Sequence, residues 1–132
     1  MWISDIESIV LARVKSNVME KLKTKYPNLF FTTSDRNQSD PKFPTVLLRE
    51  LNSAERGNDL ENTHVNAYQC MIQVDVIDNL SQSRAKEVMR YILDEMKKMS
   101  FSIIQASTPD NNSDTYRVVS RFRREIGWND TL

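Results

Sequence analysis

The side chains that most often do chemistry are sparse in this sequence. It holds one histidine, His64, and one cysteine, Cys70, six residues further along. Metal sites usually need clustered His, Cys or carboxylate ligands, and a histidine catalyst needs a nucleophile or a carboxylate beside it. No triad signature is present, so the pattern favours an exposed loop histidine and a small core cysteine. The only glycines, Gly57 and Gly127, exclude a glycine-rich phosphate loop.

The adjacent carboxylates Asp94 and Glu95 are a second candidate for chemistry. Paired carboxylates can hydrolyse glycosides. Both acids fall on the polar side of the predicted helix together with Arg90, Lys97 and Lys98. This favours a solvated helix face over an active site. The six methionines are scattered and two of them, Met96 and Met99, continue an apolar stripe, so packing is favoured over a soft-metal site.

An arginine cluster near the C-terminal end is the main concentration of charge. Its members are Arg117, Arg121, Arg123 and Arg124. The first three share one face of a strand, because side chains two residues apart point the same way. One interpretation is contact with phosphate or with acids of another subunit, and the other is a solvated face balanced by Asp114 and Glu125. Zero net charge and the lack of an RNA-binding aromatic signature favour subunit contacts over nucleic acid.

Length and composition describe one domain over residues 1–132, ending in a short polar tail at 127–132. Lys plus Arg and Asp plus Glu each number 18, so little charge repulsion opposes self-association. The apolar runs are far shorter than a membrane span, and no basic region precedes an apolar run. We therefore expect a protein made in a reducing cytoplasm, without a signal peptide.

Two amphipathic helices are predicted from apolar residues that recur every three or four positions. The first covers about 4–25 and ends before Pro27, with this stripe: Ile3, Ile6, Val10, Val14, Val18 and Leu22. The second covers 81–99, capped by Ser81 or Ser83. Its stripe is Ala85, Val88, Ile92, Met96 and Met99.

Four strands are predicted at 43–51, 66–77, 101–106 and 116–126. Pro44 belongs at a strand start or on an edge, because it cannot donate to a ladder. The strict alternation in 66–77 predicts one buried face and one mostly polar face, with Ile72 in the core. Loops are expected at 35–41 and 109–114, and a long exposed connection at 52–62.

These elements predict an α+β fold: a roughly four-stranded, mainly antiparallel sheet with two amphipathic helices packed on one face. Successive strands can pair as antiparallel neighbours. The helix between the strands 66–77 and 101–106 allows a second arrangement, in which those two strands form a parallel pair.

This order of elements resembles the tail terminator proteins of long-tailed bacteriophages, also called tail-completion or head–tail joining proteins. The likeness covers about residues 3–126. It rests on the first helix and on the segments "FPTVLLREL", "YQCMIQVDVID", "SRAKEVMRYILDEMKKMSF" and "TYRVVSRFRREI". No single motif among them is diagnostic.

The resemblance implies a virion structural protein without catalytic residues, metal or cofactor. Such a subunit forms a hexameric ring that caps the tail tube, ends tail elongation and joins the tail to the head. The implied partners are other copies, the tail-tube protein and a head-side neck protein, with DNA passing without sequence-specific binding and no membrane. Its place would be the tail–head junction of a phage or phage-tail-like particle, assembled in the host cytoplasm. Expected interface residues are the four arginines named above together with Arg56, Asn58 and Asp59.

Two other functions stay open from the sequence. One is a head-side connector or stopper of the same neck. The other is a small ligand-binding or enzymatic α+β domain, against which the lone histidine and the missing glycine-rich loop count.

Overall fold

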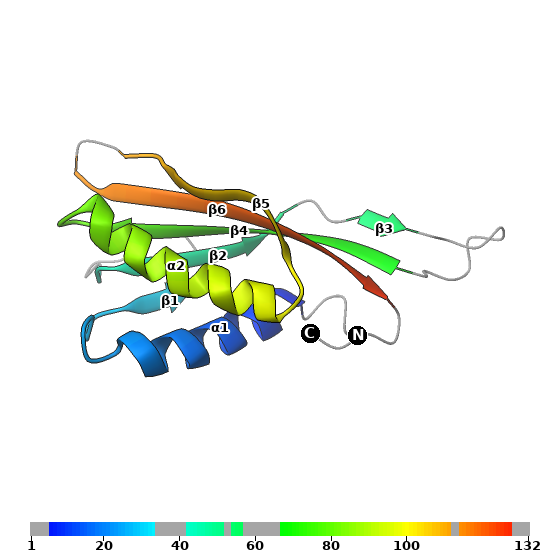
Figure 1. Ribbon diagram of the computed structural model, residues 1–132, viewed down its shortest axis with the longest axis horizontal. Helices are drawn as coiled ribbons and strands as arrows, with labels where there is room; N and C mark the ends of the chain where they lie inside the picture. The colour runs from blue at the N-terminus through cyan, green and yellow to red at the C-terminus, as the bar shows by residue number, and fades with distance from the viewer. Residues whose placement is uncertain (1–5, 34–41, 52–53, 57–66, 112–113, 128–132) are drawn as a thin grey trace.

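The structure is a computed structural model that describes residues 6–33, 42–51, 54–56, 67–111 and 114–127. Two helices and six strands follow one another along the chain (Figure 1). In chain order they are α1 (Ile6–Leu22), β1 (Phe30–Thr32), β2 (Thr45–Glu50), β3 (Ala54–Arg56), β4 (Ala67–Asp78), α2 (Gln82–Lys98), β5 (Ser102–Pro109) and β6 (Tyr116–Gly127).

The strands form one mixed sheet in the order β1-β2-β4-β6-β5, with β3 paired to β4. The pairs β2–β4, β4–β6, β5–β6 and β3–β4 are antiparallel, and only β1–β2 is parallel. The predicted α+β fold is therefore confirmed, with two strands more than expected. Both additions, β1 and β3, have three residues. Segments this short are too short to show an alternating apolar pattern in the sequence. Their backbone hydrogen bonds are made to a longer neighbouring strand.

The sequence allowed the strands 66–77 and 101–106 to form a parallel pair. In the structure they run in the same direction but do not pair. β4 and β5 each run antiparallel to β6, so they run parallel to one another with β6 between them. The chain leaves β4, crosses through α2, adds the outer strand β5 and returns along β6. Because β6 lies between β4 and β5, these two strands do not pair with each other.

Both helices pack on the same face of the sheet, as predicted (Figure 1). The α1 stripe from Ile6 to Leu22 and the α2 stripe from Ala85 to Met99 are buried. Helix α2 lies against β4, β5 and β6, and α1 lies against β1, β2 and α2; Ile72 of β4 is fully buried in this core. Helix α1 ends at Leu22, three residues before the predicted end, and a turn then buries Tyr26 and Leu29 against the same core.

The ends of α2 follow from local side-chain and backbone bonds. Ser81, and not Ser83, is the N-cap, and its hydroxyl accepts from the Arg84 N–H at 3.2 Å. At the other end Ser100 has a positive φ of 65°. There the Phe101 N–H donates to the Met96 carbonyl and the Ser100 N–H to the Lys97 carbonyl. This is a Schellman motif, with Phe101 and Met96 both buried.

The β4–β6 pair extends past the helices at the end where β3 joins it (Figure 1). Each of these strands has 12 residues, which corresponds to about 40 Å. Helix α2 has 17 residues, which corresponds to about 25 Å. One end of the sheet therefore projects beyond the layer that covers the rest.

Candidate functional site

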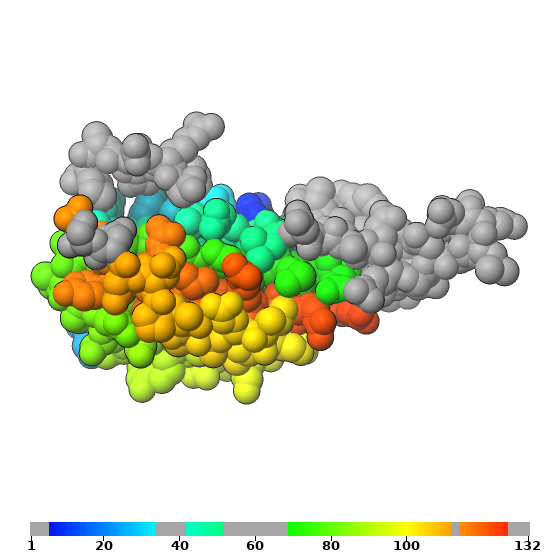
Figure 2. Space-filling model, turned by 90° about the horizontal axis from the view of Figure 1, so that it is seen from above, coloured from blue at the N-terminus to red at the C-terminus, as the bar shows by residue number. Residues whose placement is uncertain are grey.

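The sheet face turned away from the helices, here called the open face, carries most of the residues that the sequence singled out. In the described part of the chain, no helix packs on this face. It is built from alternate residues of β2, β4 and β6: Leu47, Arg49, Met71, Gln73, Asp75, Arg117, Val119, Arg121 and Arg123. In the space-filling view, atoms of β4 and β6 reach the surface between β2 on one side and β5 with α2 on the other (Figure 2). The open face is thus the side of the sheet that the described helices leave uncovered.

A row of hydrogen bonds links the polar side chains of β4 and β6 on the open face. Arg117 Nη1 donates to Asp75 Oδ2 at 3.2 Å, and Gln73 Nε2 donates to Asp75 Oδ1 at 2.9 Å. Arg121 Nε then donates to Gln73 Oε1 at 3.1 Å. Each contact joins residues of strands that are neighbours in the sheet but more than 40 positions apart in the chain, apart from the Gln73–Asp75 step. The row holds two guanidinium groups in place.

The mostly polar face that the alternation predicted on β4 is present, but its polar residues Gln73 and Asp75 are buried. Asp75 is only 1% exposed and Gln73 only 9% exposed, although no described helix covers them. The long arginine side chains of β6 shield Asp75 and Gln73 instead. The aliphatic part of an arginine can cover its neighbours while its guanidinium group forms hydrogen bonds. Leu47 and Val119 are buried on the same face. The open face is therefore partly packed by side chains of its own strands.

The structure separates the four predicted arginines into two groups. Arg117, Arg121 and Arg123 share the open face, as predicted from their spacing. Arg124 pairs in register with Cys70, on the helix side, and its Nη1 donates to the Met99 carbonyl at 2.8 Å. Arg124 therefore ties β6 to the end of α2.

One acid that meets the arginine cluster was missed from the sequence. Asp114 and Glu125 were expected as the nearby acids, and the structure adds Asp75 on β4, which accepts a hydrogen bond from Arg117. Sequence proximity does not find such a partner, because it depends on the register between β4 and β6. Pairing the two alternating patterns in an antiparallel register is the one signal that could have indicated it.

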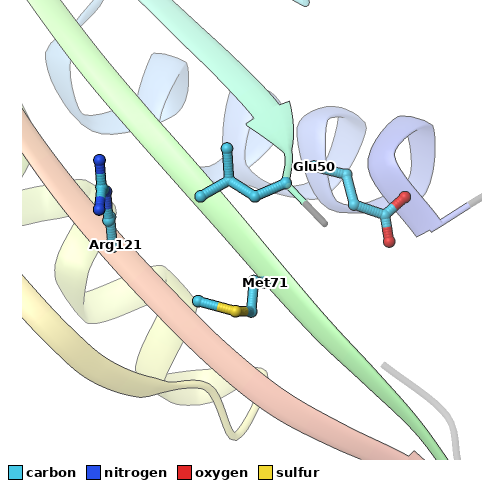
Figure 3. A pocket seen from close by; sticks show the side chains of 4 residues that line it. Glu50, Met71 and Arg121 are labelled. Atoms are coloured by element: carbon cyan, nitrogen blue, oxygen red, sulfur yellow. The ribbon is translucent and has the colours of Figure 1, made fainter. Parts of the chain in front are cut away.

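A shallow hollow of about 460 Å³ lies beside this row, where β2 ends next to β4 and β6. It is lined by Glu50, Leu51, Met71 and Arg121. Met71 and Arg121 flank it from neighbouring strands, while the Glu50 carboxylate turns away from both (Figure 3). Across the sheet from Arg121, Arg49 pairs in register with Gln73, and its buried Nε has no hydrogen-bond partner among the described residues. The hollow thus combines the apolar side chains of Leu51 and Met71 with one cation, Arg121, and with Glu50.

Of the three further predicted interface residues, the structure places one, Arg56, at the projecting end of the sheet. Arg56 is the last residue of β3 and pairs in register with Ala67. The prediction of a continuous loop over 52–62 was therefore wrong for 54–56, which form a strand on β4. Asn58 and Asp59 lie outside the described residues, and so does His64.

Glu95 corrects the prediction of a solvated acidic pair on the second helix. Asp94 is exposed, but Glu95 is 3% exposed and lies between the two helices. Asn17 Nδ2 donates to its Oε1 at 2.6 Å and Lys98 Nζ to its Oε2 at 3.0 Å, with Lys21 Nζ 3.9 Å away. Burial raises the pKa of Glu95, but the hydrogen bonds from Lys98 and Asn17 and the nearby lysines lower the pKa by more. Glu95 is thus a buried residue of α2 whose hydrogen bond with Asn17 links α2 to α1.

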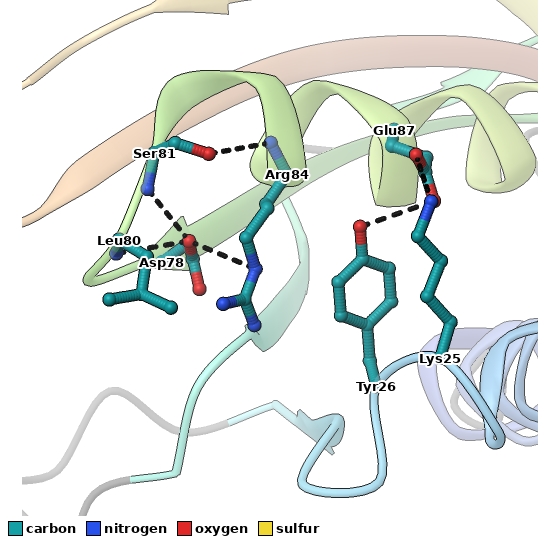
Figure 4. A network of polar contacts seen from close by, with 7 residues as sticks. All are labelled: Lys25, Tyr26, Asp78, Leu80, Ser81, Arg84 and Glu87. Atoms are coloured by element: carbon teal, nitrogen blue, oxygen red, sulfur yellow. Dashed lines mark hydrogen bonds and ion pairs between the residues drawn. The ribbon is translucent and has the colours of Figure 1, made fainter.

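A second polar network fastens the start of α2 to the end of β4 (Figure 4). The fully buried Asp78 accepts from the backbone N–H groups of Leu80 and Ser81 at 3.1 and 3.0 Å through Oδ2. The same oxygen lies 3.5 Å from Arg84 Nε. This places negative charge at the helix N-terminus, where unpaired N–H groups and the helix dipole favour it.

The same figure shows how the turn after α1 is held to α2 (Figure 4). Glu87 accepts from Lys25 at 2.8 Å and from the Tyr26 hydroxyl at 3.1 Å. The Arg84 guanidinium lies 5.1 Å from the centre of the Tyr26 ring. The hydrogen bond from Lys25 is the main reason that the pKa of Glu87 is lowered. These contacts attach the turn after α1 to α2.

Cys70 is a core residue, as predicted, and it is fully buried. Its Sγ lies 3.6 Å from Glu50 Oε2. Burial, together with the nearby Glu50 carboxylate, raises the pKa of the thiol. No group of three or more His, Cys, Asp or Glu side chains is placed to hold a metal ion within the described ranges. Of the helices seen there, neither has the length and apolar character needed to cross a bilayer.

Comparison with known proteins supports the fold alone. No family profile and no curated protein sequence matches this chain. Among solved structures, one protein whose name states no activity aligns with a TM-score of 0.51 over 94% of this chain and 97% of its own. The two sequences are 13% identical over that alignment. The chain is therefore similar in architecture to a solved protein of nearly the same extent.

Proposed function

We propose that this chain is a structural subunit of a phage tail or phage-tail-like particle, which forms a hexameric ring that caps the tail tube and joins it to the head. The resemblance of nearly the whole sequence to tail terminator proteins motivates the proposal. The observation that carries it is the one-sided layering of the fold. Both helices occupy one face, which leaves the arginine-bearing open face and the projecting β4–β6 end for contacts with other chains.

The open face has the composition that a protein interface favours. Arginine, methionine and leucine lie together there, and arginine and methionine are both enriched at interfaces. Arg117 and Arg121 are already held by Asp75 and Gln73. A side chain that is ordered before binding loses less entropy on binding, so a prearranged arginine adds more to affinity than a mobile one.

The proposal is tested on the purified chain by native mass spectrometry and negative-stain electron microscopy. We expect a closed ring with six copies, and binding of that ring to the end of assembled tail tubes. Tail tubes made in its absence should vary in length. A chain that stays monomeric both alone and with tail tubes would contradict the proposal. A ring that binds the portal side of the head and not the tube would instead support the connector function.

A further inference from the structure

Three arginines of the open face lack a carboxylate partner within the described part of the chain. Arg123 forms no hydrogen bond or ion pair with any described residue, and Arg121 forms only the bond from its Nε to the Gln73 amide oxygen. The buried Nε of Arg49 has no hydrogen-bond partner there either. The open face therefore carries positive charge that its own described residues do not neutralise.

These arginines stand close together on the sheet. Arg49, Gln73 and Arg121 pair in one row across β2, β4 and β6, so the two arginines are two strand spacings apart, about 10 Å. Arg123 follows Arg121 by two residues on the same face, which corresponds to about 7 Å. Side chains two residues apart in any extended segment have this same spacing and direction. An extended segment with acids at alternate positions therefore matches Arg121 and Arg123.

The hollow adds an apolar contact beside the arginines. Met71 pairs in register with Arg123, and the Leu51 N–H donates to the Met71 carbonyl at 2.7 Å, so the three residues are neighbours across the sheet. Met71 and Arg121 flank the hollow from neighbouring strands (Figure 3). An apolar side chain that enters the hollow is then one or two strand spacings, about 5–10 Å, from the arginines. An acid and an apolar residue two positions apart in one segment fit this arrangement.

We propose that the open face binds an extended acidic segment of a different protein, whose carboxylates pair with Arg121 and Arg123 and whose neighbouring apolar side chain enters the hollow. Arginine forms paired, directional bonds with carboxylates. The bond to Gln73 holds Arg121 in place before binding, so less side-chain entropy is lost. The inference deepens the proposed function and rests on it, since it gives the chemistry of a partner that this face would meet.

The described part of this chain offers no segment of that kind, which favours a different protein as the source. Its strands all belong to the sheet already. Of the acids that the structure shows exposed, two lie on helices, two lie in the turn after β5 and one belongs to the open face itself. In that order they are Glu20, Asp94, Asp110, Asp114 and Glu125. None of them stands in an extended segment outside the sheet.

An acidic segment also fits this face better than DNA does. Binding of DNA depends on neutralising many phosphates, so it favours a broad surface of one sign. Here Asp75 already pairs with Arg117, and the exposed Glu125 follows Arg123 by two residues on the same face. The apolar side chains of the hollow have no counterpart in a phosphate backbone. A contact with few carboxylates and one apolar residue suits such a mixed surface.

The test measures binding of an end-capped peptide, Ser-Glu-Ser-Glu-Ser-Leu-Ser, to the full chain by isothermal titration calorimetry, with circular dichroism to check folding. Arg121→Gln/Arg123→Gln should raise the Kd of this peptide about tenfold or more, because charge-assisted hydrogen bonds are lost. Replacing both glutamates of the peptide by glutamine should have an equally large effect. Replacing its leucine by serine should raise the Kd about fivefold, since the shallow hollow buries only part of that side chain.

A matched control neutralises the same amount of charge elsewhere. Lys86 and Lys97 are exposed on α2. At physiological salt, distant surface charges are screened, so Lys86→Gln/Lys97→Gln should keep the Kd within about twofold of wild type. A short DNA duplex added in competition should not displace the peptide. Native mass spectrometry of wild type and Arg121→Gln/Arg123→Gln should show the same ring, because the partner of this face is a different protein.

Several outcomes would overturn the inference. A wild-type ring that does not bind the peptide, or a peptide that binds Arg121→Gln/Arg123→Gln as tightly as wild type, would exclude this site and leave the ring established. An equal loss in the lysine control would show nonspecific attraction to positive charge. Displacement by DNA, without an effect of the leucine, would assign the face to DNA.

Two results of native mass spectrometry keep this inference apart from the proposed function. Loss of the ring in Arg121→Gln/Arg123→Gln would assign the face to a second copy of this chain, which overturns the inference and supports the ring. Binding of the peptide at Arg121 and Arg123 by a wild-type chain that forms no ring would support the acidic-segment site and contradict the proposed ring.

Discussion

Arg117 and Asp75 lie side by side on the open face, with Arg117 Nη1 3.2 Å from Asp75 Oδ2, although 42 positions separate them in the chain. The Asp75 side chain is 1% exposed and that of Arg117 is 34% exposed. A buried carboxylate needs a partner, because an unpaired buried charge is costly. The ion pair with Arg117 therefore explains how the Asp75 carboxylate can be buried on a sheet face that no described helix covers.

Removing one partner of this pair should destabilise the fold. Arg117→Ala should lower the free energy of unfolding by about 1–3 kcal/mol, less than for a fully buried pair because Arg117 is partly solvated. A double-mutant cycle with Asp75→Asn, followed by urea denaturation, should give a coupling energy of about 0.5–3 kcal/mol. Arg123→Ala, on the same face, is the control. Additive effects of the two changes would contradict the pairing.

Glu95 should make stability depend on pH. Its pKa is lowered in the folded state, so its contribution is fully present above the unfolded value of about 4.3 and is lost as pH falls through the folded value. Glu95→Gln should cost about 1–3 kcal/mol at pH 7, and the difference from wild type should shrink at low pH. Asp94→Asn, at the exposed neighbour, should show neither effect. Urea denaturation at several pH values from 7 to 3 measures this, and a constant difference would contradict it.

The core face of β4 should be the most sensitive part of the sheet. Ile72 is fully buried in the core between the helices and the sheet face of β4, so Ile72→Ala should cost about 2–5 kcal/mol. Ile104 on β5 is 49% exposed, and Ile104→Ala should cost well under half as much. Thermal and urea unfolding of both variants give the comparison. Equal losses would mean that burial on this face is not what stabilises the fold.

The sequence left Ser81 and Ser83 as alternatives for the N-cap of α2, and the structure assigns the cap to Ser81. Ser81 accepts from the Arg84 N–H, so Ser81→Ala should cost about 0.5–2 kcal/mol. Ser83 is exposed, and Ser83→Ala should change stability by less than about 0.5 kcal/mol. A larger effect at Ser83 in urea denaturation would reverse the assignment of the cap.

The Cys70 thiol should be unreactive in the folded protein. It is fully buried, and burial together with Glu50 raises the pKa of the thiol, which reduces the reactive thiolate. Labelling by a maleimide should be at least about a thousandfold slower than in the urea-unfolded chain, since it requires opening of the core. Rapid labelling without denaturant would place Cys70 outside a stable core.

The sequence by itself was sufficient to predict the helices, the long strands and the side of the sheet on which the helices pack. Apolar residues at helical spacing placed α1 and α2, and strict alternation placed β4 and β6. The same alternation put Arg117, Arg121 and Arg123 on one face. These features depend on the local geometry of one element, so one segment contains the information.

Only the tertiary structure decided which of these residues meet. The short strands β1 and β3 exist because longer strands supply their hydrogen bonds, and neither has a pattern of its own. Glu95 seemed solvated from its helix alone, yet Asn17 of the other helix reaches it. Asp75 became the partner of Arg117 because β6 inserted beside β4 in one register. Contacts between elements depend on the order of strands and the packing of helices, which are decided by burial over the whole chain and by no single segment.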